Sequence, residues 1–181
     1  QVSQEARYRQ MMEEPVYTLI PRLAVPTIVS MLVTAVYNMA DTYFVSQLGT
    51  SPSAAVGVVF SLMTGIQAVA FMIGMGCGNE IARLLGQKEV EEAERYVATG
   101  FFTEMLVGTM LAVLGIACSG QLVYRLGATP TIAPYAASYT RYALLGVPFF
   151  MCSLGMNNML RFQGNSFYSM LGIATGGILN I

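Results

Sequence analysis

The sequence predicts an all-α membrane protein, and three observations support this fold class. Hydrophobic residues make up 55% of the 181 residues and charged residues only 10%, whereas about a quarter of a soluble domain is charged. The apolar residues gather in runs of about 20, the length of a helix that crosses a bilayer. The few charges cluster, mostly in the segments that separate these runs.

The elements follow from these runs in order. Residues 1–18 are polar, and we expect a cytoplasmic N-terminal segment. The first run is too long for the core of a cleavable signal peptide. Five membrane spans are predicted, of which the fifth is incomplete: Leu19–Phe44, Ala54–Gly76, Val97–Ser119, Tyr135–Leu160 and Phe167–Ile181. Because the fifth is still apolar where the sequence stops, we expect the N-terminal part of a longer protein.

The basic residues predict the orientation. With a cytoplasmic N-terminus, most of them lie inside, as the positive-inside rule requires. The inside group is Arg7, Arg9, Arg22, Arg83, Lys88, Arg95 and Arg161, and the outside group is Arg125 and Arg141. We expect a multi-pass protein of the plasma membrane. Between the second and third spans, NEIARLLGQKEVEEAERYVATG predicts a short amphipathic helix on the membrane surface.

Composition argues against several function classes. No basic stripe is present that could follow a phosphate backbone, so a nucleic-acid partner is not expected. The sequence contains no His, and Cys77, Cys118 and Cys152 stand alone in apolar runs. That spacing argues against a zinc site or a disulfide framework. No nucleophile–base or metal constellation is apparent, so we do not expect an enzyme, nor a cofactor.

A polar stripe runs along the first predicted helix. Its members lie three or four residues apart, which places them on one helix face: Thr27, Ser30, Thr34, Tyr37, Asn38 and Asp41. Such a stripe must face protein or a water-filled cavity.

Asp41 has two interpretations. It lies in the outer part of its span, so it could simply extend to the outer headgroups. The stripe favours function, because a carboxylate within a membrane span is a functional-site hypothesis by default. Such a group suits a proton or a small cation. Pro26 removes one backbone hydrogen bond from the same helix, so it is either a static kink or a hinge.

Other polar residues lie in the later spans. Asn157 follows Ser153 by one turn near the inner end of the fourth span, and Asn180 lies in the fifth. Their amides suit either bridging of helices or coordination of a cation, and both interpretations stay open. Glu104, in the third span, is expected to reach the inner interface or a neighbouring helix. Gly74, with Gly78, predicts close helix packing.

Four stretches of the sequence carry motifs in a recognisable order. The first is EEPVYTLIPRLAVPTIVSMLVTAVYNMADTYFVSQLGT, with a basic residue before L-A-x-P and a D-T-x-F-V near the outer helix end. The others are GCGNEIARLLGQKEVEEAER, NNMLRFQGNSFYSMLG and GGILNI. Each is weak by itself, but their order and spacing are fairly specific, and together they cover nearly the whole chain. In this order they resemble the multidrug and toxic compound extrusion (MATE) transporters, of the DNA-damage-inducible branch.

The resemblance implies an antiporter of twelve helices in two six-helix lobes, of which this chain would be about five helices of the first lobe, ending within the fifth. It implies export of amphipathic, often cationic compounds, driven by inward H⁺ or Na⁺. Asp41 matches the ion-coupling residue, with Asn180 and Asn157, and Asp41 and Asn180 would hold Na⁺ if Na⁺ is the ion. Pro26 matches a residue implicated in bending. The substrate cavity would include Thr34, Tyr37, Asn38, Ser153 and Asn157.

The partners expected on this basis are small amphipathic or cationic substrates, membrane lipid and the missing C-terminal half of the same protein. A flippase for lipid-linked oligosaccharides, from the same superfamily, is the alternative. A basic cavity stripe would favour it, but the stripe here is acidic and neutral. A non-catalytic membrane subunit or a truncated fragment is a third hypothesis.

Overall fold

The computed structural model describes residue 9, residues 13–47 and residues 49–180. Of residue 180, only the backbone is described. Within these residues the elements are six helices, and no strand occurs. They are α2 (Val16–Ser46), α3 (Thr50–Gly86), α4 (Val90–Ala117), α5 (Ser119–Arg125), α6 (Ala133–Phe162) and α7 (Ser166–Asn180). The all-α fold class is confirmed.

Four of these helices, α2, α3, α4 and α6, are long and apolar enough to cross a membrane. α7 is a shorter apolar helix, at the position of the incomplete fifth span. Each predicted span lies largely within one of them, but α3 continues ten residues past the predicted end at Gly76. The described residues therefore contain four helices long enough to span a membrane and one shorter apolar helix.

The predicted amphipathic surface helix between the second and third spans is wrong. α3 continues to Gly86 and α4 begins at Val90, so only a tight turn separates them. Lys88 adopts a positive φ of 64° in that turn. The cause is apolar packing: Ile81 and Leu84 lie in one buried cluster with Ala93 and Met159. Because burial against α4 and α6 stabilises this segment, it extends the bundle instead of lying flat on the membrane.

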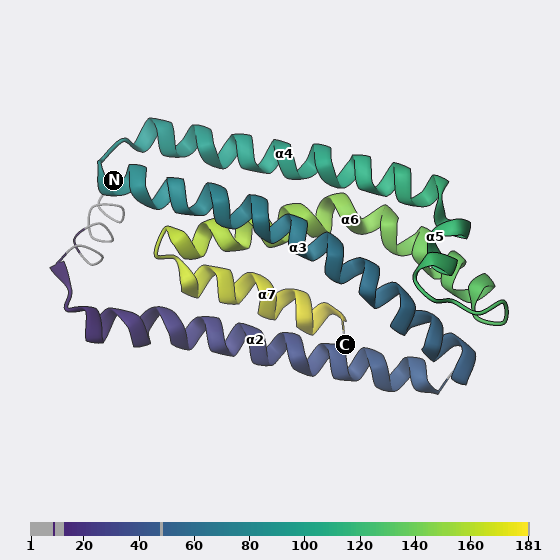
Figure 1. The fold of residues 1–181 in the computed structure, drawn as a ribbon. Coiled ribbons are helices and arrows are strands. Elements are labelled where there is room, and N and C mark those ends of the chain that lie inside the picture. Colours follow the sequence, from purple (N-terminus) through teal and green to yellow (C-terminus); the bar gives the residue numbers. More distant parts are fainter. Residues whose placement is uncertain (1–8, 10–12, 48, 181) are drawn as a thin grey trace.

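The bundle has a core of three helices with two more along one side (Figure 1). α6 packs extensively on α3 and on α4, whereas α2 packs mainly against α7. Buried side chains form three clusters along the core, one near each end and one in the middle. α2 is the least covered helix: Ser30 is its buried residue. The α2–α7 layer is thus attached to the core less tightly than the core helices are to one another.

Glycines set the closest approach within the core, as predicted for Gly74 and Gly78. A Cβ added to Gly74 would lie 2.7 Å from the Cα atom of Gly155 on α6. A Cβ on Gly78 would collide with the ring of Phe162, also on α6. α3 and α6 therefore cross with their backbones in contact, an arrangement that small residues permit in membrane helices.

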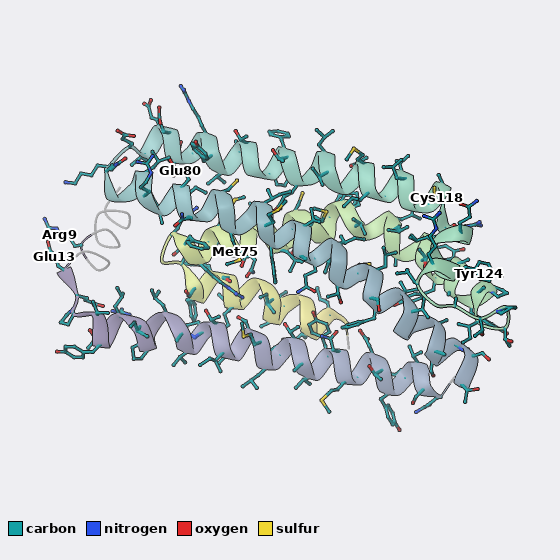
Figure 2. The ribbon with its side chains drawn as sticks, viewed as in Figure 1. Arg9, Glu13, Met75, Glu80, Cys118 and Tyr124 are labelled. Atoms are coloured by element: carbon teal, nitrogen blue, oxygen red, sulfur yellow. The ribbon has the colours of Figure 1, made fainter. Side chains whose placement is uncertain are left out.

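Charged and polar side chains lie at both ends of the bundle. Figure 2 shows Arg9, Glu13 and Glu80 at one end and Cys118 and Tyr124 at the other. The latter end also holds the short helix α5, which was not predicted. There Nε of Arg141 donates to Oγ of the buried Ser119, at 3.0 Å. This bond ties α6 to the start of α5.

Candidate functional site

The hydroxyls of the α2 stripe bond within their own helix. Thr27 donates to the carbonyl of Leu23 at 3.0 Å, and Ser30 donates to that of Pro26 at 2.8 Å. Thr34 donates to the carbonyl of Ser30 at 2.9 Å. Such bonds to the carbonyl four residues earlier satisfy the hydroxyl without a partner helix, and they often bend the helix that carries them. Around Pro26, α2 therefore lacks one backbone amide donor, and its hydroxyls need no hydrogen-bond partner on another helix.

α7 covers the stripe from Ser30 to Tyr37 and leaves Asn38 and Asp41 open. Ser30 is buried, and Thr34 and Tyr37 are half-buried. A Cβ on Gly177 of α7 would lie 2.9 Å from Cγ1 of Val33 and 3.3 Å from Cδ1 of Tyr37, so α7 contacts α2 at this level. The next stripe residues, Asn38 and Asp41, are exposed. The stripe therefore leads from a helix contact to an uncovered carboxylate.

Asp41 has no hydrogen bond or ion pair within the described part of the chain, whose two ion pairs lie elsewhere. The same residues contain no group of three or more His, Cys, Asp or Glu that could hold a metal ion. Asp41 is thus a single acidic group near the C-terminal end of a membrane helix. A cation bound there would need neutral oxygen ligands to complete its shell.

The register of α2 and α7 brings the position of Asn180 towards Asp41. The two helices run in the same direction (Figure 1) and touch where Tyr37 meets Gly177. Asp41 is four residues beyond Tyr37, and Asn180 is three beyond Gly177. At 1.5 Å per residue, both positions are about 5 Å further along their helices, so they lie at the same level. The predicted pairing of Asp41 with Asn180 stays a prediction that this register favours.

Asn157 occupies a different place. Its Nδ2 donates to the carbonyl of Ser169 at 3.0 Å, and Oγ of Ser169 donates to its Oδ1 at 2.5 Å. Nε of Arg161 in turn donates to Oγ of Ser169, at 2.9 Å. These three residues, which we call the α6–α7 polar link, fasten the start of α7 to the end of α6.

The link is remote from Asp41. Gly177 follows Ser169 by eight positions on α7 and contacts Tyr37 on α2. Asp41 lies one further turn along α2, four positions beyond Tyr37. The distance along the helix axes is roughly 18 Å. Asn157 and Asp41 therefore do not ligate one ion in this conformation. A part for Asn157 in ion coupling stays a prediction that this separation does not favour.

Ser153 lies one turn before Asn157 on α6 and is exposed. α7 lies between α6 and α2, because it contacts both of them. The residues predicted to line the cavity are thus distributed on two helices that α7 joins, with Thr34, Tyr37 and Asn38 on α2. Their role as a substrate cavity stays a prediction.

Removal of the Ser169 hydroxyl tests the α6–α7 polar link. We expect Ser169→Ala to lower the free energy of unfolding by about 1–3 kcal/mol, because part-buried groups of Arg161 and Asn157 would lose a partner. The measurement is thermal unfolding of the purified full-length protein. The matched control is Thr175→Ala on the same helix, whose exposed hydroxyl donates to Leu171 in its own helix. Equal stability of the two variants would contradict the proposed link.

The family model described as MatE matches residues 26–181. The chain belongs to the MatE family. An outward-facing structure of a multidrug resistance MATE family transporter of the MOP superfamily superposes with a TM-score of 0.87 and 29% identity. The superposition covers 94% of the chain described here and 38% of the chain of that transporter. These residues therefore match the N-terminal lobe of a MATE transporter.

Two curated relatives are similar over nearly the whole chain. The FAD transporter of Shewanella oneidensis is 24% identical over 171 residues, which are 94% of this chain and 38% of that protein. The multidrug export protein MepA of Staphylococcus saprophyticus is 23% identical over 159 residues, 87% of this chain and 35% of that protein. The MATE chain here thus spans little more than a third of the length of these relatives.

Sequence reasoning missed Ser169 and Arg161, two members of the α6–α7 polar link. Arg161 counted only as an inside charge, and Ser169 is an ordinary serine in an apolar run. Ser169 is fully buried, and its importance comes from the fold of the connection between two MATE helices. A buried Asn requires a partner, so Asn157 was the signal that could have started that search.

Proposed function

We propose that the full-length protein is a secondary transporter of the plasma membrane that exports amphipathic, often cationic compounds in exchange for H⁺ or Na⁺. The observation that carries the proposal is the polar stripe of α2, which ends in the exposed carboxylate of Asp41 at the same level along the bundle as the position of Asn180. Membership of the MatE family and relatives named as transporters support transport and give no support to catalysis. The cytoplasmic N-terminus follows from the positive-inside rule.

The proposed coupling uses the charge of Asp41. Binding of a proton or Na⁺ neutralises the carboxylate and lowers the cost of placing this part of α2 in an apolar environment. A cationic substrate favours the carboxylate in its charged, ion-free form, so ion and substrate compete for it. Tyr37, one turn away, offers an aromatic face that suits an organic cation. Coupling requires that each ligand bind the two conformations with different affinity.

We infer that α2 bends at Pro26 during this exchange. Pro26 lies inside α2, where it cannot donate the backbone hydrogen bond of an ordinary helical residue. α2 is also the helix least held by the core, and its stripe hydroxyls are satisfied within the helix itself. The part of α2 beyond Pro26, which carries Asp41, is thus the part of the lobe that can move at least cost.

The variant Pro26→Ala tests the bend. Ala is about 3 kcal/mol more favourable than Pro inside a helix, so the straight form of α2 gains stability. We expect the rate of ion-driven export to fall several-fold while the affinity for substrate changes less than twofold. The control is Pro21→Ala, in the same helix but one turn nearer its start. If both variants export at the same rate, Pro26 is a static kink.

The experiment on function uses full-length protein in liposomes. An imposed Na⁺ or H⁺ gradient should drive accumulation of ethidium, an organic cation, and abolition of that gradient should stop it. FAD is the second substrate to test, because one relative is named for its transport. If no gradient moves either compound although folded protein is present in the membrane, the exporter proposal is wrong. Movement of a fluorescent lipid-linked oligosaccharide instead would favour the flippase.

A further inference from the structure

Glu104 is a fully buried carboxyl group that the proposed transport mechanism does not use. It lies at the middle of α4, with 0% of its surface exposed. Neither carboxylate oxygen has a hydrogen-bond partner among the described residues. It therefore lacks both of the compensations that normally accompany a buried charge, solvent and a partner.

The carboxyl group lies at the closest approach of three helices. A Cβ on Gly155 of α6 would collide with Oε1, Oε2 and Cδ of Glu104. A Cβ on Gly74 of α3 would lie 3.4 Å from Oε1 of Glu104 and 3.2 Å from the carbonyl oxygen of Gly155. The carboxyl group of Glu104 thus lies against the backbone of α6 at the point where α3 also contacts α6. Gly74 and Gly155 leave the space that this carboxyl group occupies.

The titratable groups that face Glu104 from the two adjacent helices are thiols. They are Cys77 on α3 and Cys152 on α6. Sγ of Cys77 lies 3.2 Å from the position of a Cβ on Gly100, one turn before Glu104. Sγ of Cys152 lies 3.7 Å from the carbonyl oxygen of Phe101, also on α4. A thiol carries no positive charge, so neither group can form an ion pair with a carboxylate.

We propose that Glu104 is a proton-binding site of this lobe, separate from Asp41, and that it holds a proton while α3, α4 and α6 are packed as they are here. An isolated ionised carboxylate in such surroundings is far more costly than the neutral acid, and binding one proton removes the charge. The ligand is a proton, not a metal ion, because the described residues contain no group of three or more His, Cys, Asp or Glu that could hold a metal ion. The site lies in the three-helix core, whereas Asp41 lies on α2, so the inference does not depend on the proposed coupling.

The experiment is infrared spectroscopy of the full-length protein in lipid at pH 7.5, comparing the native sequence with Glu104→Gln. We expect the difference spectrum to show the loss of one carboxylic acid C=O band, which shifts when H₂O is exchanged for D₂O. The control is Glu94→Gln, an exposed residue of the same helix, for which carboxylate bands are lost instead. If Glu104→Gln also removes carboxylate bands, or leaves the acid region unchanged, the proposal is wrong.

A second measurement needs no variant, in case Glu104→Gln does not fold. In protein labelled with ¹³C at the glutamate side-chain carboxyl and at glycine, solid-state NMR should show one Glu carboxyl with the chemical shift of a neutral acid. That signal should have cross-peaks to glycine Cα, since Gly155 and Gly74 surround the group. A carboxyl with those glycine contacts but the shift of a carboxylate would overturn the proposal.

Discussion

Full-length protein carrying Asp41→Asn is expected to lose ion-driven export at least tenfold. The asparagine keeps the size of the side chain and removes its charge, so the ion has nothing to neutralise and the competition between ion and cation ends. The measurement is ethidium efflux from cells that lack their own exporters, with membrane expression quantified for each variant. Export that persists against a gradient would make Asp41 a structural residue that extends to the headgroups.

The control and a second assay separate coupling from folding and from substrate binding. Thr42→Ala, at the adjacent position, removes a hydroxyl that bonds only back to Asn38 in its own helix, at 2.8 Å, and should export normally. In liposomes without an ion gradient, Asp41→Asn should also weaken the exchange of substrate for substrate, because the proposed competition places ion and cationic substrate on the same carboxylate. Full retention of that exchange would show that Asp41 serves the ion alone. Varying Na⁺ at fixed pH, and the reverse, then identifies the coupling ion.

The variant Gly74→Ala is expected to give a large loss of stability, because its new methyl group would meet a backbone atom. The new Cβ would lie 2.7 Å from the Cα atom of Gly155, a backbone atom that cannot rotate away. Overpacking of this kind costs about 1–3 kcal/mol, and more where two backbones must separate. Thermal unfolding of the purified full-length protein, together with its yield, measures the loss.

Gly76→Ala provides a matched control two residues away on the same helix. A Cβ at Gly76 meets no atom within 4 Å, and Ala is favoured over Gly in a helix by about 1 kcal/mol. We expect this variant to be as stable as the native sequence or slightly more so. If the two alanines had the same effect, the close crossing of α3 and α6 would be contradicted.

The candidate site divides into a part that the pattern predicted and a part that packing decided. The stripe from Thr27 to Asp41 follows from helical spacing alone, because residues three and four apart share a face. The α6–α7 polar link does not, because its three members come from two helices whose relative position no local pattern encodes. Asn157 shows the difference: the sequence left open whether its amide bridges helices or binds a cation, and the structure shows it bonded to Ser169.

By itself, the sequence predicted the all-α fold class, the apolar helices, the polar stripe of α2 and the likeness to MATE transporters. Each of these depends on residues close together along the chain and on the absence of water in the bilayer core, which forces a spanning segment into a helix. Only the tertiary structure decided where helices end and touch. The α3–α4 connection became a tight turn because Ile81 and Leu84 gain burial against α4 and α6. Glu104 acquired its isolated environment because Gly74 and Gly155 let two backbones meet beside it, a contact between residues distant in sequence.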